Sequence, residues 1–155
     1  MEYKGIYKTL SNDAYHAEEK HLSSSNLKML LKDTNQFYKE KILGEREPLK
    51  GAFLDEGSYT HSLILEPHLV PEEYLFFDGN RKAGKVWKAF EEENKDSGKI
   101  ILSAPQKAKV ESWVEAYKKR PEAVDLVEGS DKEFSLFSEM LGVPLKVRAD
   151  IINIE

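Results

Sequence analysis

Residues 143–154 read VPLKVRADIINI, and the expected fold class follows from this stretch. Apolar and charged residues alternate along it, as in a β-strand, whose side chains point to opposite faces in turn. Residues 133–140, EFSLFSEM, follow a similar alternation, and Leu141-Gly142 separates the two runs. The sequence therefore predicts a β-hairpin that turns around Leu141-Gly142.

Helical patterns fill most of the chain before this hairpin. Apolar residues recur at three- and four-residue spacing, which is typical of amphipathic helices. We expect helices over residues 27–44, 50–66, 82–95, 103–120 and 121–127, and short strands over 74–77 and 99–102. Residues 1–21 predict a short strand or an irregular arm. Because helices come first and the hairpin last, we predict an α/β (α+β) fold in a single domain over residues 1–155.

Three residues mark the ends and the interior of these helices. Ser103 stands three residues before Gln106, a spacing that predicts a capping box at a helix start. Pro67 predicts the end of the preceding helix, because the residue before a proline is disfavoured in the α conformation. Gly57 lies inside that helix at a cost of about 1 kcal/mol relative to Ala, so we expect another backbone to approach it closely.

Composition excludes several classes of protein. The 155 residues carry 23 Lys and Arg against 28 Asp and Glu, a formal net charge of −5, and no Cys. A disulfide scaffold, a zinc finger and a thiol nucleophile are therefore excluded. The longest apolar runs are too short to span a membrane, and the charged N-terminus argues against a signal peptide. The acidic balance argues against a protein that coats nucleic acid by bulk charge, but permits a localised site.

One face of the predicted hairpin carries charges. Lys146, Arg148 and Asp150 share that face, and Glu133 falls opposite Arg148 or Asp150, depending on the register. Two carboxylates on one strand pair predict a site for a hard divalent cation. The alternative is an ordinary charged face, on which Glu133 pairs with Arg148 or Lys146 across the strands.

His61 is the second candidate metal ligand. It lies on the helix side shared by Leu54, Gly57, Ser58 and Leu65, so we expect it to face inward over the small residues. Imidazole can bind a metal or orient a catalytic group. The alternative is a buried histidine that bonds to a carbonyl oxygen.

A basic turn precedes the third helix. Arg81, Lys82 and Lys85 surround its first residues, and a helix N-terminus with nearby cations can hold a phosphate. The alternative is an ordinary solvated first turn.

Aromatic residues and the other histidines fit structural roles. The third helix is expected to bury Val86, Trp87 and Phe90, and Trp113 is expected in the core rather than on a base-stacking platform. The remaining three histidines lie in polar stretches and are expected at the surface: His16, His21 and His68.

Several segments, in a fixed order, resemble a known family. They are residues 25–28 (SNLK), 57–67 (GSYTHSLILEP), 81–87 (RKAGKVW), the helix after 101–103 (ILS), 133–137 (EFSLF) and 146–150 (KVRAD). Together they resemble the RecE-type (exonuclease VIII-like) phage and prophage exonucleases of the PDDEXK superfamily. The resemblance extends from about Leu22 to Asp150.

The resemblance implies a fold, an activity and a site. The family's restriction-endonuclease-like fold has helices flanking a mixed central β-sheet. Its members degrade double-stranded DNA from an end and require Mg²⁺ or Mn²⁺. Carried over by position, His61 and Asp150 become metal ligands and Glu133 matches an acidic position on the preceding strand. Arg81, Lys82, Lys85 and Arg148 are the candidate contacts to DNA.

The resemblance also implies a biological setting. Related exonucleases act in phage-type recombination, so we expect a cytoplasmic protein of a bacterial host, encoded by a phage or prophage. A single-strand annealing protein is a candidate partner, and a homo-oligomer is a candidate assembly because related nucleases form rings around DNA.

One element of the family's site is missing from residues 1–155. The family's next strand carries an Asp-x-Lys motif, whose Asp binds metal and whose Lys orients the attacking water, and no such motif follows Asp150. The chain is therefore expected to be the N-terminal portion of the domain, incomplete at its C-terminus and inactive alone. Two alternatives stand: a non-catalytic nuclease-like module that binds a protein partner or DNA, and a structural domain in which His61 and Asp150 are incidental.

Overall fold

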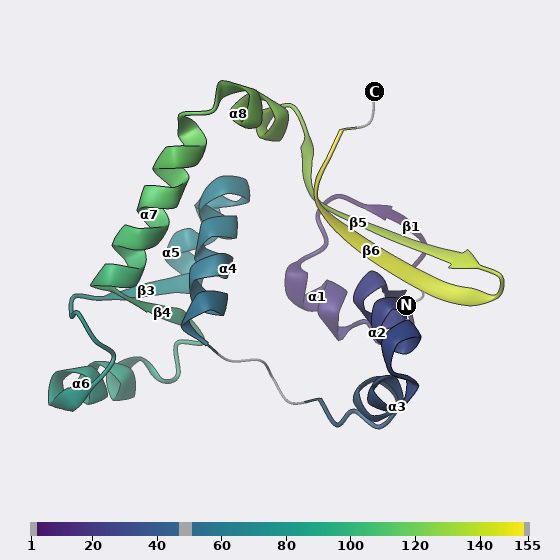
Figure 1. The fold of residues 1–155 in the computed structure, drawn as a ribbon, viewed down its shortest axis with the longest axis horizontal. Coiled ribbons are helices and arrows are strands. Elements are labelled where there is room, and N and C mark those ends of the chain that lie inside the picture. Colours follow the sequence, from purple (N-terminus) through teal and green to yellow (C-terminus); the bar gives the residue numbers. More distant parts are fainter. Residues whose placement is uncertain (1–2, 47–50, 154–155) are drawn as a thin grey trace. The chain divides into compact units, whose positions relative to one another are not determined.

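The computed structural model describes residues 3–46 and 51–153. These residues fall into two compact units (Figure 1). We call residues 3–46 and 129–153 the hairpin unit, and residues 51–128 the helix unit. Predictions that involve Lys50 or residues 154–155 lie outside the described residues, and the single domain over residues 1–155 stays a prediction.

The hairpin unit is built on a mixed four-stranded sheet. Its two long antiparallel strands, β5 (Asp131–Met140) and β6 (Val143–Ile152), confirm the predicted hairpin (Figure 1). The short strand β1 (Gly5–Tyr7) pairs antiparallel with β5, and β2 (Leu22–Ser23) pairs parallel with β6. Leu141 and Gly142 form the turn, with φ values of 54° and 76°. Positive φ at both residues is what a type I′ turn requires, and this turn matches the twist of the strands.

The helices of the hairpin unit are shorter than the sequence predicts. The expected helix over residues 27–44 is divided into α2 (Ser24–Lys32), α3 (Thr34–Phe37) and a π-helical turn, Tyr38–Ile42. Asp33 causes the break, because its backbone is extended and its carboxylate accepts hydrogen bonds from the first amides of α3. A further helix, α1 (Asn12–Ala17), is too short to show a periodic pattern.

The charged face of the hairpin is the covered one. Phe137 is 1% exposed and lies among the aromatic rings of Tyr3, Tyr7, Tyr15 and His21. On the opposite face, Val147 is 44% exposed. His21 is buried, with its Nδ1 2.9 Å from Oε2 of Glu18, so its predicted place at the surface was wrong.

The helix unit follows the predicted order of elements. A two-stranded parallel sheet, β3 with β4, lies among its helices. The elements are α4 (Ala52–Leu65), a 3₁₀ turn (Pro67–Leu69), α5 (Val70–Glu73), β3 (Tyr74–Phe77), α6 (Gly84–Asn94), β4 (Ile100–Ser103), α7 (Ala104–Lys118) and α8 (Pro121–Glu128). The predicted capping box at Ser103 is present, and α4 ends before Pro67 as expected.

The core of the helix unit corrects two predictions. It consists of Tyr59, Tyr74, Leu102, Val110 and Val114. Trp87 is buried as predicted, but Val86 and Trp113 are 74% and 43% exposed. The ring of Trp87 packs with Phe77 and Phe90, so Val86 lies on the other side of α6. The ring of Trp113 lies beside the Lys109 ammonium instead of joining Val110 and Val114.

Helices and a mixed sheet together confirm the predicted α+β class. Among residues 3–46 and 51–153, no helix combines the length and the apolar character needed to cross a membrane.

Candidate metal centre

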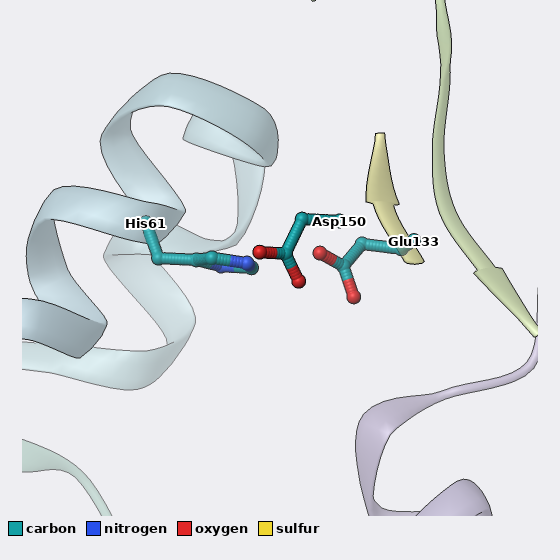
Figure 2. Close-up of side chains that lie close together, drawn as sticks. All are labelled: His61, Glu133 and Asp150. Atoms are coloured by element: carbon teal, nitrogen blue, oxygen red, sulfur yellow. The ribbon is translucent and has the colours of Figure 1, made fainter. Parts of the chain in front are cut away.

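Two carboxylates from neighbouring strands lie side by side in the hairpin unit. The register pairs Lys132 with Ile151 and Phe134 with Ala149, so Glu133 stands level with Asp150. Of the two registers considered from the sequence, the structure has the one that aligns the acids. Their side chains each offer an oxygen, and these two oxygens lie within 4.8 Å of one another (Figure 2). This spacing suits two oxygen donors to one hard cation.

The backbone of Glu133 has an uncommon conformation. Its φ is 53°, in the left-handed region that residues other than glycine rarely adopt. Such a conformation costs on the order of 1–3 kcal/mol and persists only when the surroundings enforce it. Its neighbours on β5 keep the hairpin register on both sides, so the ladder holds the distortion in place.

Arg148 holds the Glu133 side chain in position. Its Nε donates to Oε2 of Glu133 at 2.5 Å, and both side chains are 10% exposed. Its Nη1 donates to the carbonyl of Leu10 at 2.7 Å and to Oγ of Ser135 at 3.0 Å. The guanidinium therefore joins β5, β6 and the N-terminal segment around one of the two acids.

Lys146 lies on the same strand face and is also buried. Its Nζ donates to the carbonyls of Tyr15 and Glu18 and lies 4.5 Å from the centre of the Tyr15 ring. Burial lowers the pKa of Lys146 from its usual value, and the Glu18 carboxylate opposes that shift. Lys146 and Arg148 together fasten the segment around residues 10–18 to the sheet, and neither cation faces open solvent.

Glu18 is held by hydrogen bonds from its own chain. Its carboxylate accepts from the backbone N–H groups of Lys20 and His21 and contacts the His21 ring. Burial raises the pKa of Glu18, but the bonds from His21 and Lys20 outweigh it, and the net shift is downward.

His61 projects from α4 in the helix unit and is half-buried. The inward face of α4 carries Glu56, Tyr59 and Ser62, so the predicted burial of the side with Gly57 and His61 was wrong. An added Cβ at Gly57 meets no atom within 4 Å, and the expected backbone approach is therefore wrong as well. The physical reason is Tyr59, whose ring packs on Tyr74 and Phe76 and turns that side of the helix inward.

The basic turn before α6 is partly engaged in contacts. Arg81 and Lys85 are exposed. Lys82 is half-buried, with its Nζ 3.3 Å from Oδ2 of Asp55 and 5.9 Å from the centre of the Trp87 ring. Arg81 and Lys85 therefore keep cationic groups available to an anion.

The donor set matches a hard divalent cation. Glu133 and Asp150 supply carboxylate oxygens, and a carboxylate has about four lone-pair sites, so the bond from Arg148 does not exhaust its capacity to bind a metal. Mg²⁺ is commonly held by one or two carboxylates together with water and substrate phosphate. Glu133 and Asp150 on the hairpin fit that pattern, which requires no cysteine ligand.

Comparison with protein families gives a match over residues 23–155. The matching family is the PDDEXK-like domain of unknown function (DUF3799). The chain belongs to this family. The match covers most of the chain and includes His61, Glu133 and Asp150. No curated protein and no solved structure matches the chain.

PDDEXK-like membership agrees with the geometry of the hairpin. These domains have a nuclease-type fold and generally depend on a divalent metal, and the carboxylate pair supplies ligands of the required kind. The sequence alternation had already named Glu133, Arg148 and Asp150. It missed the Leu10 carbonyl and the buried Ser135, because a backbone acceptor has no sequence signal and a serine in a strand has a weak one.

Proposed function

We propose that this PDDEXK-like chain provides the metal-binding face of a RecE-type exodeoxyribonuclease, which degrades double-stranded DNA from an end in phage-type recombination. The observation that supports it most is the carboxylate pair of Glu133 and Asp150, level across β5 and β6, in a chain of a nuclease-type family.

In this proposal, His61 joins Glu133 and Asp150 to hold Mg²⁺ or Mn²⁺. A bound divalent cation would polarise a phosphoryl oxygen and activate water for attack on the phosphodiester. Asp150 is exposed and can reach both the metal and its water shell, whereas Glu133 is buried and fixed. His61 lies in the helix unit and is half-buried, and its place in the ligand set is carried over from the resemblance to the exonuclease family.

Contacts to DNA are proposed at the basic turn of the helix unit. Arg81 and Lys85 carry exposed cationic groups that can neutralise phosphates, and Lys82 can add a third when its pair with Asp55 opens. Arg148 was a further candidate, but its three hydrogen bonds favour a role inside the hairpin unit.

Metal binding tests the ligand set directly. We expect calorimetric titration of the chain with Mn²⁺ to show binding that Asp150→Asn abolishes and that Glu133→Gln and His61→Ala weaken. His68→Ala is the matched control, because His68 is an exposed histidine of the helix unit outside the proposed set. Absence of Mn²⁺ binding, or binding that is unchanged in Asp150→Asn, would contradict the proposal.

DNA binding tests the substrate class. We expect the chain with Mn²⁺ to bind a labelled linear duplex, and linear competitor to displace it better than closed circular competitor. Because residues 1–155 contain no Asp-x-Lys motif after Asp150, they are not expected to release nucleotides by themselves. Nucleotide release that His61→Ala or Asp150→Ala abolishes would refute the expected inactivity. DNA binding that does not depend on Mn²⁺, and that linear and closed circular competitors displace equally well, would favour the non-catalytic module.

A further inference from the structure

We propose that Arg148 is a positioning residue that fixes Glu133 for metal binding, with its own orientation set by the Leu10 carbonyl. The inference rests on the proposed metal site. It goes beyond that site by giving Arg148, first considered for DNA phosphate, a role inside the sheet.

The contacts of the guanidinium leave it little freedom. Arg148 donates to Glu133, Ser135 and the Leu10 carbonyl at 2.5–3.0 Å, and 10% of its side chain is exposed. A planar guanidinium presents its donors in a fixed fork, so the three acceptors bonded to Nε and Nη1 determine its plane. With these three bonds and little exposed surface, the guanidinium is poorly placed to contact a phosphate group.

Because the guanidinium is held in place, the Glu133 carboxylate bonded to it is held in place as well. Its backbone is in the left-handed region and its Oε2 is bonded by Nε of Arg148. Outer partners that orient ligating carboxylates and histidines typically change metal affinity by about 10- to 100-fold when they are removed. Arg148 therefore sets the orientation of the Glu133 carboxylate.

The Leu10 carbonyl extends this arrangement beyond the matched family region. Leu10 precedes residue 23, where the family match begins. Its oxygen accepts from Nη1 of Arg148, on the same guanidinium that bonds Glu133. The segment before the family region thus helps to set the geometry of the acid.

A double-mutant cycle on Mn²⁺ affinity tests the inference. We expect Arg148→Met to weaken Mn²⁺ binding by about tenfold or more when Glu133 is present, and to have no further effect in the Glu133→Gln background. A purely structural role for Arg148 would weaken binding equally in both backgrounds, and that result would overturn the inference. Lys8→Met is the matched control, because it removes an exposed ion pair with Asp131 on the same hairpin and should leave the affinity unchanged.

A second variant guards against loss of folding. Arg148→Met leaves the buried Glu133 carboxylate without its cation, so its fold must be checked by circular dichroism and thermal unfolding. Arg148→Lys keeps the charge but not the fork, and we expect a folded protein with weakened Mn²⁺ binding. Affinity equal to that of the unmodified chain in Arg148→Lys would overturn the inference.

The outcomes separate the two proposals. Mn²⁺ binding that depends on Asp150 but not on Arg148 would refute the positioning role and leave the metal site intact. Absence of Mn²⁺ binding by the unmodified chain would refute the metal site itself, and the positioning role with it.

Discussion

The ammonium of Lys146 donates to the backbone carbonyl of Tyr15 at 2.6 Å, across a separation of 131 residues. A second bond, to the Glu18 carbonyl, lets Lys146 link β6 both to α1 and to the residue that follows it. A buried cation thus takes the place that an apolar side chain would fill in most sheets.

Replacing this lysine should destabilise the chain. Lys146→Met leaves the carbonyls of Tyr15 and Glu18 without their donor, and each buried unpaired acceptor costs about 1–3 kcal/mol. We expect urea denaturation to show a loss of at least about 2 kcal/mol in the free energy of unfolding. Lys8→Met, which removes an exposed ion pair, should cost less than about 1 kcal/mol. Equal losses in the two variants would contradict the assignment of Lys146 as a structural tie.

Glu18 should make stability depend on pH in the acid range. Its pKa is lower in the folded chain than its ordinary value of 4.5, so its ionised form stabilises the fold. That contribution is present above the ordinary value and is lost as the pH falls through the lower folded value. We expect Glu18→Gln to be less stable than the unmodified chain at about pH 7, and the difference to shrink toward about pH 3. A difference that stays constant over this range would exclude Glu18 as the source.

The hairpin turn offers a stabilising substitution. Leu141 is 97% exposed and adopts a φ of 54°, which Asn tolerates better than Leu. Asn-Gly is also a preferred sequence for a type I′ turn. We expect Leu141→Asn to raise the free energy of unfolding by about 0.5–1 kcal/mol, measured by chemical denaturation. Leu141→Val, whose β-branch is poorly accommodated at positive φ, should lower it, and the reverse order would contradict the turn assignment.

The start of α7 should be sensitive to its cap. Ser103 is buried, and it forms a capping box with Gln106. We expect Ser103→Ala to cost about 1 kcal/mol of stability. Ser112→Ala, at an exposed position of the same helix, should change it by less than about 0.5 kcal/mol. Thermal unfolding of both variants makes the comparison, and a harmless Ser103→Ala would show that the cap contributes little.

DNA contact at the basic turn should appear in the salt dependence of binding. Arg81 is exposed, so Arg81→Ala should weaken binding of duplex DNA and reduce the slope of log affinity against log salt by about 1. Lys95→Ala is the control. Lys95 directly follows α6, forms an ion pair with Glu92 and lies outside the basic turn. An unchanged slope for Arg81→Ala would remove Arg81 from the DNA site.

Much of the fold could be predicted because its signals are local. The hairpin follows from alternation over two ten-residue strands, and α7 from the spacing of Ser103 and Gln106. The short elements could not be predicted in the same way. β2 has two residues and α1 has six, and both depend on contacts with β6 and the sheet rather than on periodicity.

The burial of the two hairpin faces was the harder problem. Alternation separates Lys146 and Arg148 from Val147, and a polar face usually meets water. Here the N-terminal segment supplies carbonyl acceptors to both cations and covers Phe137 with aromatic rings. Those acceptors are backbone carbonyls, so no pattern of side chains predicts them. The acids Glu133 and Asp150 could be named from the sequence, but the left-handed backbone of Glu133 could not.

The placement of β1 and α1 has a practical consequence for where this protein can be cut. The family match starts at residue 23, yet Gly5–Tyr7 forms an edge of the sheet and Tyr15 is part of the hydrophobic core. A polypeptide trimmed to residue 23 would expose the ring of Phe137 and leave both buried cations facing water. We therefore expect the shortest stably folded fragment to begin before Gly5, upstream of residue 23, where the family match begins. In a series of N-terminal truncations, the stable fragments should be those that retain Gly5.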